Sequence, residues 1–205
     1  SFGDGDGEFS EPAGIAADAN GDIYVTDGNS RIQKFDSDGN FIAKWGSFGE
    51  EPGYFHYPFG IAADSKGFVY VADTVNNRIQ KFDANDNFKL VWCKDEVREG
   101  DKFSSPFGIA TDNSDSIYVT DCHRIIKFDS DGNLKWAKGF IGTEPGQFVI
   151  PFGISVDGDM IYVADTGNHR IQKFDIDGNF ISVIGEGGGG PGQVRWPKGV
   201  FAKND

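Results

Sequence analysis

Short segments of alternating hydrophobic and polar residues run along the chain, and turn sequences separate them. An alternation of period two predicts β-strands, because successive side chains of a strand point to opposite faces of a sheet. At the start of the chain, the predicted strands cover 14–18, 23–27, 31–36 and 41–45. The sequences between them are typical of hairpin turns: Asn20-Gly21, Gly28-Asn29 and Asp38-Gly39. We therefore expect four antiparallel strands in this stretch.

The pattern repeats with a period in the forties. The motif Pro-x-Gly-Ile begins at Pro12, Pro58, Pro106 and Pro151, and a related Pro-x-Gly-Val begins at Pro197. Successive copies are 46, 48, 45 and 46 residues apart. Four short strands in a repeat of this length are typical of β-propeller blades. The sequence predicts an all-β protein of four-stranded antiparallel blades in a single domain, 1–205, with repeats at 12–57, 58–105, 106–150 and 151–196 and the first strand of a fifth at 197–205.

A second motif marks the third predicted strand of each repeat. Arg-Ile-Gln-Lys-Phe-Asp begins at Arg31, Arg78 and Arg170, and Arg124 begins the variant Arg-Ile-Ile-Lys-Phe-Asp. Together with Pro-x-Gly-Ile-Ala and Ile-Tyr-Val-Ala-Asp, these motifs make the chain resemble the NHL-repeat family over essentially its whole length. The resemblance implies a closed ring of about six blades. We therefore expect a segment of a longer propeller. The alternative is an open or oligomeric arrangement in which self-association or a partner chain completes the ring.

Charged residues that recur in every repeat have a structural interpretation. An Asp ends each second predicted strand and the motif Arg follows within three to five residues, which predicts an ion pair across the hairpin. The Asp-x-Asp-Gly-Asn sequences that begin at Asp36, Asp129 and Asp175 resemble the opening of a calcium loop. They lack the Glu that such a loop carries at its twelfth position, so we interpret them as tight turns.

Acidic residues dominate the charge of the chain, whose formal net charge is -13. This charge repels polyanions at long range, so we expect neither a nucleic acid nor an anionic membrane as the main partner. No stretch approaches the roughly 18 consecutive apolar residues of a membrane-spanning helix, so we expect no membrane insertion.

The x of Pro-x-Gly should line the mouth of the central channel of a propeller. The loops from fourth to first strands and from second to third strands share that face, which is the default binding surface of the fold. The position is occupied by Ala13, Phe59, Phe107, Phe152 and Lys198. Three successive phenylalanines would form an apolar collar, which serves either as packing between blades or as an anchor for a ligand.

Further candidates for ligand contact lie in the loops of the same predicted face. Their aromatic, amide, imidazole and guanidinium groups suit mixed apolar and hydrogen-bonded contact. They are Tyr54, Phe55, His56, Tyr57, Asn76, Asn77, His123, Asn168, His169, Arg195 and Trp196. The predicted ligand-binding residues are Phe59, Phe107, Phe152, Lys198, Tyr54, His56, Tyr57, His123, His169, Arg195 and Trp196.

The resemblance also raises an enzymatic alternative. The NHL family includes amidating lyases, whose zinc-binding histidines occupy the x of Pro-x-Gly, and no histidine stands at that position here. The three histidines, His56, His123 and His169, fall in three different predicted blades, whereas zinc needs its ligands around one centre. Nucleophile-elbow, P-loop and dinucleotide-binding fingerprints are absent from the sequence. We therefore expect no catalytic residue, metal or cofactor in this chain.

Two cysteines bear on the cellular compartment. Cys93 follows the fourth strand of the second repeat and Cys122 lies in the shortened turn of the third, so both should lie on the same face of adjoining blades. A comparable pair looks bridged in the lyase relatives, so the resemblance implies a disulfide as one alternative and two unlinked thiols as the other. A disulfide would favour an extracellular or periplasmic protein, and the localisation otherwise stays unknown.

Three functions remain open from the sequence. We expect first a non-catalytic scaffold that presents its loop face to a protein, peptide or glycan ligand. The second is an RNA-binding propeller, which would use stacking aromatics and the sparse basic residues Lys94, Arg98, Arg195 and Lys198. The third is a propeller enzyme, a lyase or hydrolase, whose catalytic residues lie in blades outside this chain.

Overall fold

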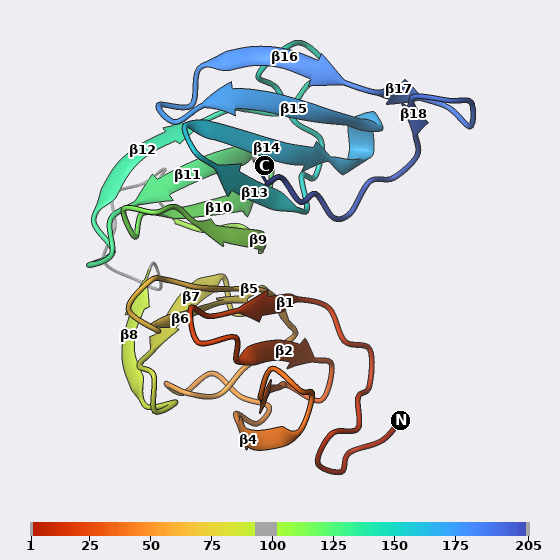
Figure 1. Ribbon diagram of the computed structural model, residues 1–205. Helices are drawn as coiled ribbons and strands as arrows, with labels where there is room; N and C mark the ends of the chain where they lie inside the picture. The colour runs from red at the N-terminus through yellow and green to blue at the C-terminus, as the bar shows by residue number, and fades with distance from the viewer. Residues whose placement is uncertain (1, 93–101, 204–205) are drawn as a thin grey trace. The chain divides into compact units, whose positions relative to one another are not determined.

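The computed structural model describes residues 2–92 and 102–203, which form eighteen β-strands and one short 3-10 helix (Figure 1). The chain divides into two compact units, Ser1–Pro106 and Phe107–Asp205. Each unit holds two four-stranded antiparallel sheets with their strands in chain order. The prediction of an all-β fold of four-stranded antiparallel blades is confirmed. The prediction that all four sheets belong to one domain is not tested and stays a prediction.

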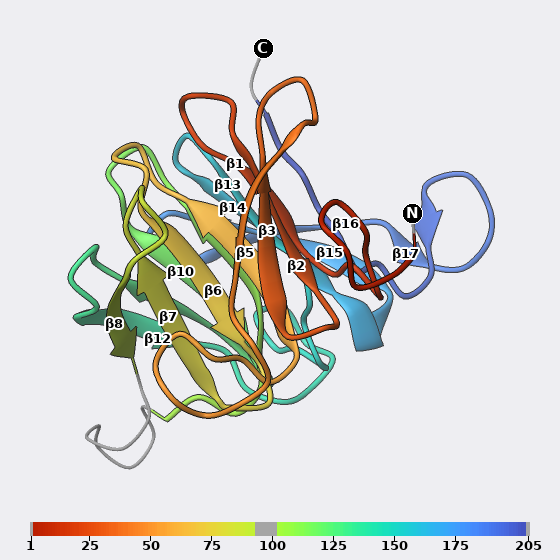
Figure 2. The same ribbon diagram turned by 90° about the horizontal axis from the view of Figure 1, so that it is seen from below.

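The first unit contains blades 1 and 2. Blade 1 consists of β1 (Ile15–Ala17), β2 (Ile23–Asp27), β3 (Arg31–Phe35) and β4 (Phe41–Trp45). Blade 2 consists of β5 (Pro58–Ala63), β6 (Val69–Asp73), β7 (Arg78–Phe82) and β8 (Phe88–Trp92). The innermost strand of blade 2, β5, packs against β1 and β2 of blade 1 (Figure 2).

Blades 3 and 4 follow the same plan in the second unit, with β9 starting at the boundary of the two units. Blade 3 consists of β9 (Pro106–Thr111), β10 (Ile117–Asp121), β11 (Arg124–Phe128) and β12 (Leu134–Lys138). Blade 4 consists of β13 (Ile154–Asp157), β14 (Met160–Asp165), the 3-10 helix η1 (Thr166–Asn168), β15 (Arg170–Asp175) and β16 (Phe180–Ile184). A short parallel pair, β17 (Glu186–Gly187) and β18 (Gln193–Val194), extends from the end of blade 4.

A buried tyrosine in the second strand explains part of the Ile-Tyr-Val motif. The Tyr24 hydroxyl is buried and donates a hydrogen bond to Asp18 Oδ2 at 3.0 Å. Burial raises the pKa of Tyr24 to about 12, so the hydroxyl remains a donor. The equivalent bonds in the next two blades are Tyr70 to Asp64 at 2.8 Å and Tyr118 to Asp112 at 2.9 Å. The aspartate between the first and second strands is therefore a structural acceptor.

The Asp-x-Asp-Gly-Asn sequences form tight turns, as predicted. Asp36 Oδ1 accepts hydrogen bonds from the backbone N–H groups of Asp38 (3.0 Å) and Asn40 (2.8 Å). Asp36 Oδ2 accepts a third from the Asn40 side chain at 2.9 Å. These bonds hold the pKa of Asp36 below its usual range, the side chain of Asn40 contributing most. The first carboxylate of the motif is thus used within its own turn.

The glycine of Pro-x-Gly has a steric role between blades. A Cβ on Gly14 would lie 2.3 Å from the carbonyl oxygen of Phe59, in the first strand of the next blade. Thr26 Oγ1 donates a hydrogen bond to the same oxygen at 2.7 Å. The second unit repeats this arrangement, with Gly108 and Thr120 around the carbonyl oxygen of Phe152. Only glycine allows the neighbouring backbone to come this close.

This close approach predicts a large difference between two glycines of the same motif. In the 205-residue chain, Gly108→Ala should lower the free energy of unfolding by about 2–3 kcal/mol, because the new methyl group must push the Phe152 carbonyl away. Gly199→Ala is the matched control, since no atom of the described residues lies within 4 Å of the position that its Cβ would take. Urea denaturation measures both variants. Equal stability of the two would contradict the steric role.

The turn at the end of β7 predicts a pH dependence of stability. The Lys89 ammonium, 2.6 Å from the Asp83 carboxylate, is the main cause that lowers the pKa of Asp83 to about 2. Because this pKa is below the usual value of 3.8, the folded state gains stability from Asp83 above about pH 4 and loses it as the pH falls to about 2. In Asp83→Asn this part of the acid destabilisation should be absent, measured by urea unfolding between about pH 5 and pH 2. Asp38→Asn, in another turn, controls for the removal of one carboxylate.

Candidate ligand-binding face

Four equivalent loops precede the first strand of a blade or of the predicted fifth repeat. We call them inter-blade loops: residues 2–11, 47–57, 140–150 and 186–196. Each is closed by a parallel bridge between two residues that lie seven positions apart. The bridged pairs are Phe2 with Phe9, Phe48 with Phe55, Ile141 with Phe148, and Gly187 with Val194. The four loops can therefore be compared position by position.

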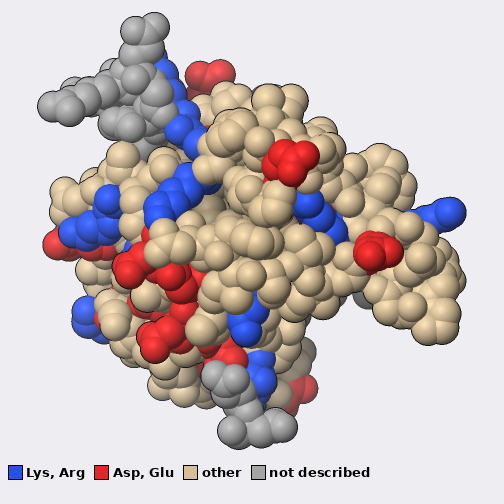
Figure 3. Space-filling view, turned by 90° about the horizontal axis from the view of Figure 1, so that it is seen from above, with Lys and Arg blue, Asp and Glu red and all other residues tan. Residues whose placement is uncertain are grey.

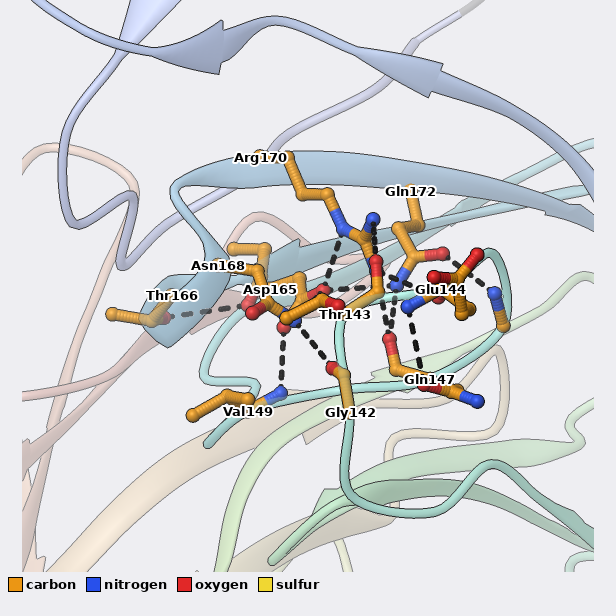
Figure 4. Close-up of polar contacts among 12 residues, drawn as sticks. Gly142, Thr143, Glu144, Gln147, Val149, Asp165, Thr166, Asn168, Arg170 and Gln172 are labelled. Carbon is orange, nitrogen blue, oxygen red and sulfur yellow. Dashed lines mark hydrogen bonds and ion pairs between the residues drawn. The ribbon is translucent and has the colours of Figure 1, made fainter.

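A buried carboxylate and an arginine fix the inter-blade loop that leads into blade 4 (Figure 4). Arg170 donates to Asp165 Oδ2 at 2.8 Å and also to three backbone carbonyls of the loop. The three acceptors are the carbonyls of Thr143 (2.7 Å), Glu144 (2.9 Å) and Gln147 (3.0 Å). Gln172 adds two bonds, one from its Nε2 to the Gln147 carbonyl and one to its Oε1 from Gly146 N–H. We call this Asp-Arg-Gln network the loop clamp.

The same clamp occurs in both blades of the first unit. In blade 2, Arg78 contacts Asp73 Oδ2 at 2.6 Å and donates to the carbonyls of Glu50, Glu51 and Tyr54. Gln80 donates to the Tyr54 carbonyl and accepts from Gly53 N–H. In blade 1 the members are Asp27, Arg31 and Gln33. The predicted hairpin ion pair is present in all four blades, at Asp27–Arg31, Asp73–Arg78, Asp121–Arg124 and Asp165–Arg170.

Large apolar side chains point to solvent at one equivalent position of three inter-blade loops. The exposed fractions are 84% for Phe2, 69% for Phe48 and 64% for Ile141. Each of these residues precedes a glycine, in Phe-Gly or Ile-Gly, so the repeat alignment carried a signal for them. The sequence analysis did not identify these residues. Each of them enlarges the apolar surface of its own inter-blade loop.

The aromatic loop predicted around Tyr54 is only partly exposed. Tyr54 and Tyr57 are each 46% exposed, and the half-buried His56 packs edge-on against Phe48 with ring centroids 4.8 Å apart. Phe55 is fully buried in the core between blades 1 and 2, against Phe82. The prediction for Phe55 is wrong, because the parallel bridge turns this ring inward while its neighbours face solvent.

Three of the predicted channel-mouth residues meet in the second unit. The rings of Phe107 and Phe152 stack with centroids 4.3 Å apart and an interplanar angle of 20°. Lys198 Nζ lies 5.9 Å from the centroid of the Phe152 ring. Both phenylalanines are half-buried, as is Phe59 in the first unit. The stacked pair serves as packing between blades 3 and 4 and leaves part of its surface to solvent.

Histidine and asparagine side chains in the turns between second and third strands form hydrogen bonds with backbone groups. His169 Nδ1 accepts a hydrogen bond from the Trp196 N–H at 3.1 Å, and His123 Nδ1 accepts one from Ile150 N–H at 3.3 Å. In blade 2, Asn77 Oδ1 accepts a hydrogen bond from Ser105 N–H. Asn76 and Asn168 donate to the loop carbonyls of Gly49 and Gly142. These asparagines therefore help to hold the loops, and their contact with a ligand stays a prediction.

Several sequence-based predictions concern residues that the structure does not describe. Cys93, Lys94 and Arg98 lie outside the described residues, so the Cys93–Cys122 disulfide stays a prediction, and Cys122 itself is half-buried. In the described part of the chain, no cluster of three or more His, Cys, Asp or Glu is arranged to hold a metal ion. Within residues 2–92 and 102–203, no helix is long and apolar enough to cross a membrane.

Lys and Arg side chains are interspersed with acidic and uncharged side chains on the surface drawn in Figure 3.

Comparison with known families identifies the repeat. A family model described as NHL repeat matches residues 9–35, 55–82 and 148–174. The chain belongs to the NHL-repeat family. Each matched NHL segment runs from the bridged phenylalanine of an inter-blade loop to the phenylalanine of a third strand, so it contains the Asp, Arg and Gln of one loop clamp. Protein lin-41 of Caenorhabditis elegans is 54% identical over 43 residues, which are 20% of this chain and 4% of that protein.

Solved structures place the NHL chain among β-propellers. A virginiamycin B lyase from Staphylococcus aureus aligns with a TM-score of 0.66 and 21% identity, over 95% of this chain and 61% of that chain. A chain of a nidogen/laminin complex aligns with a TM-score of 0.65 and 21% identity, over 85% of this chain and 64% of that chain. The chain thus spans less than two thirds of either structure. At this level of identity the similarity establishes the fold alone.

The loop clamp predicts that one buried arginine controls both stability and loop order. Arg78→Met should lower the free energy of unfolding by about 3–5 kcal/mol, because the buried charge of Asp73 loses its cationic partner. The amides of residues 49–55 should exchange hydrogen faster, since three loop carbonyls lose the bonds that Arg78 donates. Lys89→Met, which breaks an exposed ion pair, is the control and should cost less than about 1 kcal/mol. Similar losses in both variants would show that the clamp adds little.

Proposed function

We propose that this NHL chain is a non-catalytic scaffold whose inter-blade loops bind a protein or peptide. The observation that carries the proposal is the exposed apolar side chain at one equivalent position of three inter-blade loops: Phe2, Phe48 and Ile141. Exposure of a phenylalanine ring to water is unfavourable in free energy, and a protein that makes no contact through this surface gains nothing from it. An exposed apolar side chain that recurs on loops with a fixed backbone favours a role of these loops in contact with a partner.

The clamp gives these side chains an advantage in binding. Backbone that is already fixed loses less conformational entropy when a partner docks, so more of the contact energy appears as affinity. Aromatic residues also dominate the energetics of protein interfaces. Tyr54 and Tyr57 add amphipathic rings beside Phe48 and His56 in the second inter-blade loop. This loop therefore supplies the densest candidate contact surface of the first unit.

The proposal assigns no catalytic role to the recurring polar residues. The recurring Asp, Arg and Gln residues of blades 1, 2 and 4 are engaged in clamps, and the turn aspartates in their own turns. Neighbouring folds include both a lyase and a member of a nidogen/laminin complex, so fold alone does not select between catalysis and binding. The polar groups recur in structural roles, whereas the apolar side chains at the loop tips differ from loop to loop. This combination supports a binding function.

Peptide selection tests the proposal. Peptides selected from a random display library against the 205-residue chain should lose at least about tenfold in affinity for Phe48→Ser/Tyr57→Ser. Ile42→Ser is the matched control, because Ile42 is 48% exposed on β4, away from the inter-blade loops, and it should bind as the wild type does. Equal affinity for all three proteins, or selection of no peptide, would overturn the proposal. Tight binding of single-stranded RNA instead of any peptide would favour the nucleic-acid alternative.

A further inference from the structure

The second inter-blade loop, residues 47–57, differs from its sister loops at one position. In the other three loops a Glu or Gln stands directly before the second bridged residue and accepts a hydrogen bond from a backbone N–H of its own loop. We call this bond the loop cap. The three caps run from Gly5 N–H to Glu8 (3.1 Å), from Glu144 N–H to Gln147 (3.1 Å, Figure 4) and from Gly190 N–H to Gln193 (2.9 Å). In the second inter-blade loop the position of the acceptor is occupied by Tyr54.

This exchange leaves one backbone donor unused and places an aromatic ring at the surface. Among residues 2–92 and 102–203, the N–H of Glu51 takes part in no hydrogen bond, although the equivalent N–H of Glu144 is capped. The Tyr54 side chain lies against Gly49, since a Cβ on Gly49 would lie 3.2 Å from Tyr54 Cδ1. Tyr54 is 46% exposed. The loop thus lacks an internal hydrogen bond and has an exposed ring instead, a change that favours contact rather than stability.

The backbone that carries this ring is fixed. Tyr54 N–H donates to the Glu51 carbonyl at 3.0 Å, which closes a tight turn over residues 51–54. Arg78 donates to the carbonyls of both residues, at 3.0 Å for Glu51 and 2.7 Å for Tyr54. The first and fourth residues of such a turn are close together. The side chains of Glu51 and Tyr54 therefore leave one rigid turn, within reach of a single ligand group.

The Glu51 side chain gives this turn a negative charge. It is exposed, and in the described part of the chain its carboxylate takes part in no hydrogen bond or ion pair. The buried Arg78 does not neutralise it, because its donors are bonded to Asp73 and to backbone carbonyls. The sequence of the loop contains a second glutamate, Glu50, and neither Lys nor Arg. Together with the net charge of -13, this turn attracts a cationic partner.

The exposure of this surface belongs to a loop whose two neighbouring blades are in place. The loop lies between blades 1 and 2, and His56 N–H donates to the clamp carboxylate of Asp73 at 2.7 Å. The sister loop 140–150 also has a blade on either side, and Ile141 there is 64% exposed, as Phe48 is 69% exposed here. Phe48 directly precedes Gly49, the residue against which Tyr54 lies. The loop therefore presents an apolar ring next to the turn that carries the charge.

We propose that the second inter-blade loop binds an arginine side chain of a peptide segment, an inference that rests on the proposed scaffold function. The guanidinium stacks on the Tyr54 ring and pairs with the Glu51 carboxylate, and an apolar neighbour of the arginine packs on Phe48. A guanidinium gains a cation–π interaction over an aromatic face and forms two parallel hydrogen bonds with a carboxylate. The unused N–H of Glu51 is a donor for a carbonyl of the peptide.

The probe is a pair of short peptides with blocked ends, acetyl-Gly-Leu-Arg-Leu-Gly-amide and the same sequence with Gln for Arg. Binding to the 205-residue chain is followed by the NMR shift of the backbone N–H of residue 51. The Arg peptide should bind the wild type with a Kd of about 1 mM or tighter, and the Gln peptide about tenfold more weakly. Glu51→Gln should remove most of this difference, whereas Glu144→Gln, at the same position of a sister loop, should keep it.

A second variant separates binding from stability. Tyr54→Gln introduces the residue that Gln147 provides in the sister loop, so it can form the missing cap. Its urea midpoint should equal or exceed that of the wild type, while the Arg peptide should bind at least about tenfold more weakly. Tyr54→Phe keeps the aromatic ring and should bind the Arg peptide as the wild type does.

Equal binding of the two peptides, binding of neither, or full binding of the Arg peptide by Tyr54→Gln would overturn the arginine proposal. The scaffold proposal is judged separately, by the display-selected peptides and Phe48→Ser/Tyr57→Ser. Selected peptides that need Phe48 and Tyr57 but bind Tyr54→Gln and Glu51→Gln as tightly as the wild type would show that only the arginine inference has failed.

Discussion

The buried carboxylate at the end of each second strand is the group on which the rest of the blade depends. Asp73 is fully buried, and an unpaired charge in that place would cost several kcal/mol. Arg78 neutralises it and has donors left over, which reach the carbonyls of the inter-blade loop. Because one guanidinium serves both partners, folding of the hairpin and docking of the loop become a single event. The loop has little regular structure of its own and is ordered by this bond network.

In this arrangement the clamp holds the backbone of an inter-blade loop and leaves its side chains free to differ. The clamp binds carbonyls and N–H groups, which nearly every residue has, so it places few demands on side-chain identity at the loop tip. The position that holds Phe48 and Ile141 also accepts Gly187 with the same bridge. Surface chemistry can therefore change from loop to loop at little cost to the fold. A repeat protein gains different binding sites in this way without a new architecture.

The sequence predicts the strands and the ion pairs because both follow from local rules. The period-two alternation, the turn residues and the Asp–Arg spacing each determine one hairpin, as at Asp27 and Arg31. The inward turn of Phe55 could not be predicted, since it depends on a bridge within the loop and on a core between two sheets. The acceptor role of His169 was equally hidden, because its partner Trp196 lies 27 residues away. Tertiary contacts, rather than composition, separate the structural members of the aromatic and polar set from the exposed ones.

The clamp aspartate holds an inter-blade loop at a second point, through the backbone. One residue after the bridged pair, the loop donates an N–H to this carboxylate: Ser10 to Asp27 at 3.1 Å, His56 to Asp73 at 2.7 Å and Val149 to Asp165 at 2.9 Å. Because the donor is a backbone N–H, the bond forms with serine, histidine or valine at this position. The side chain next to the clamp can therefore change from loop to loop while the loop stays fixed, which is the property that a repeat protein needs to vary its surface on a constant fold.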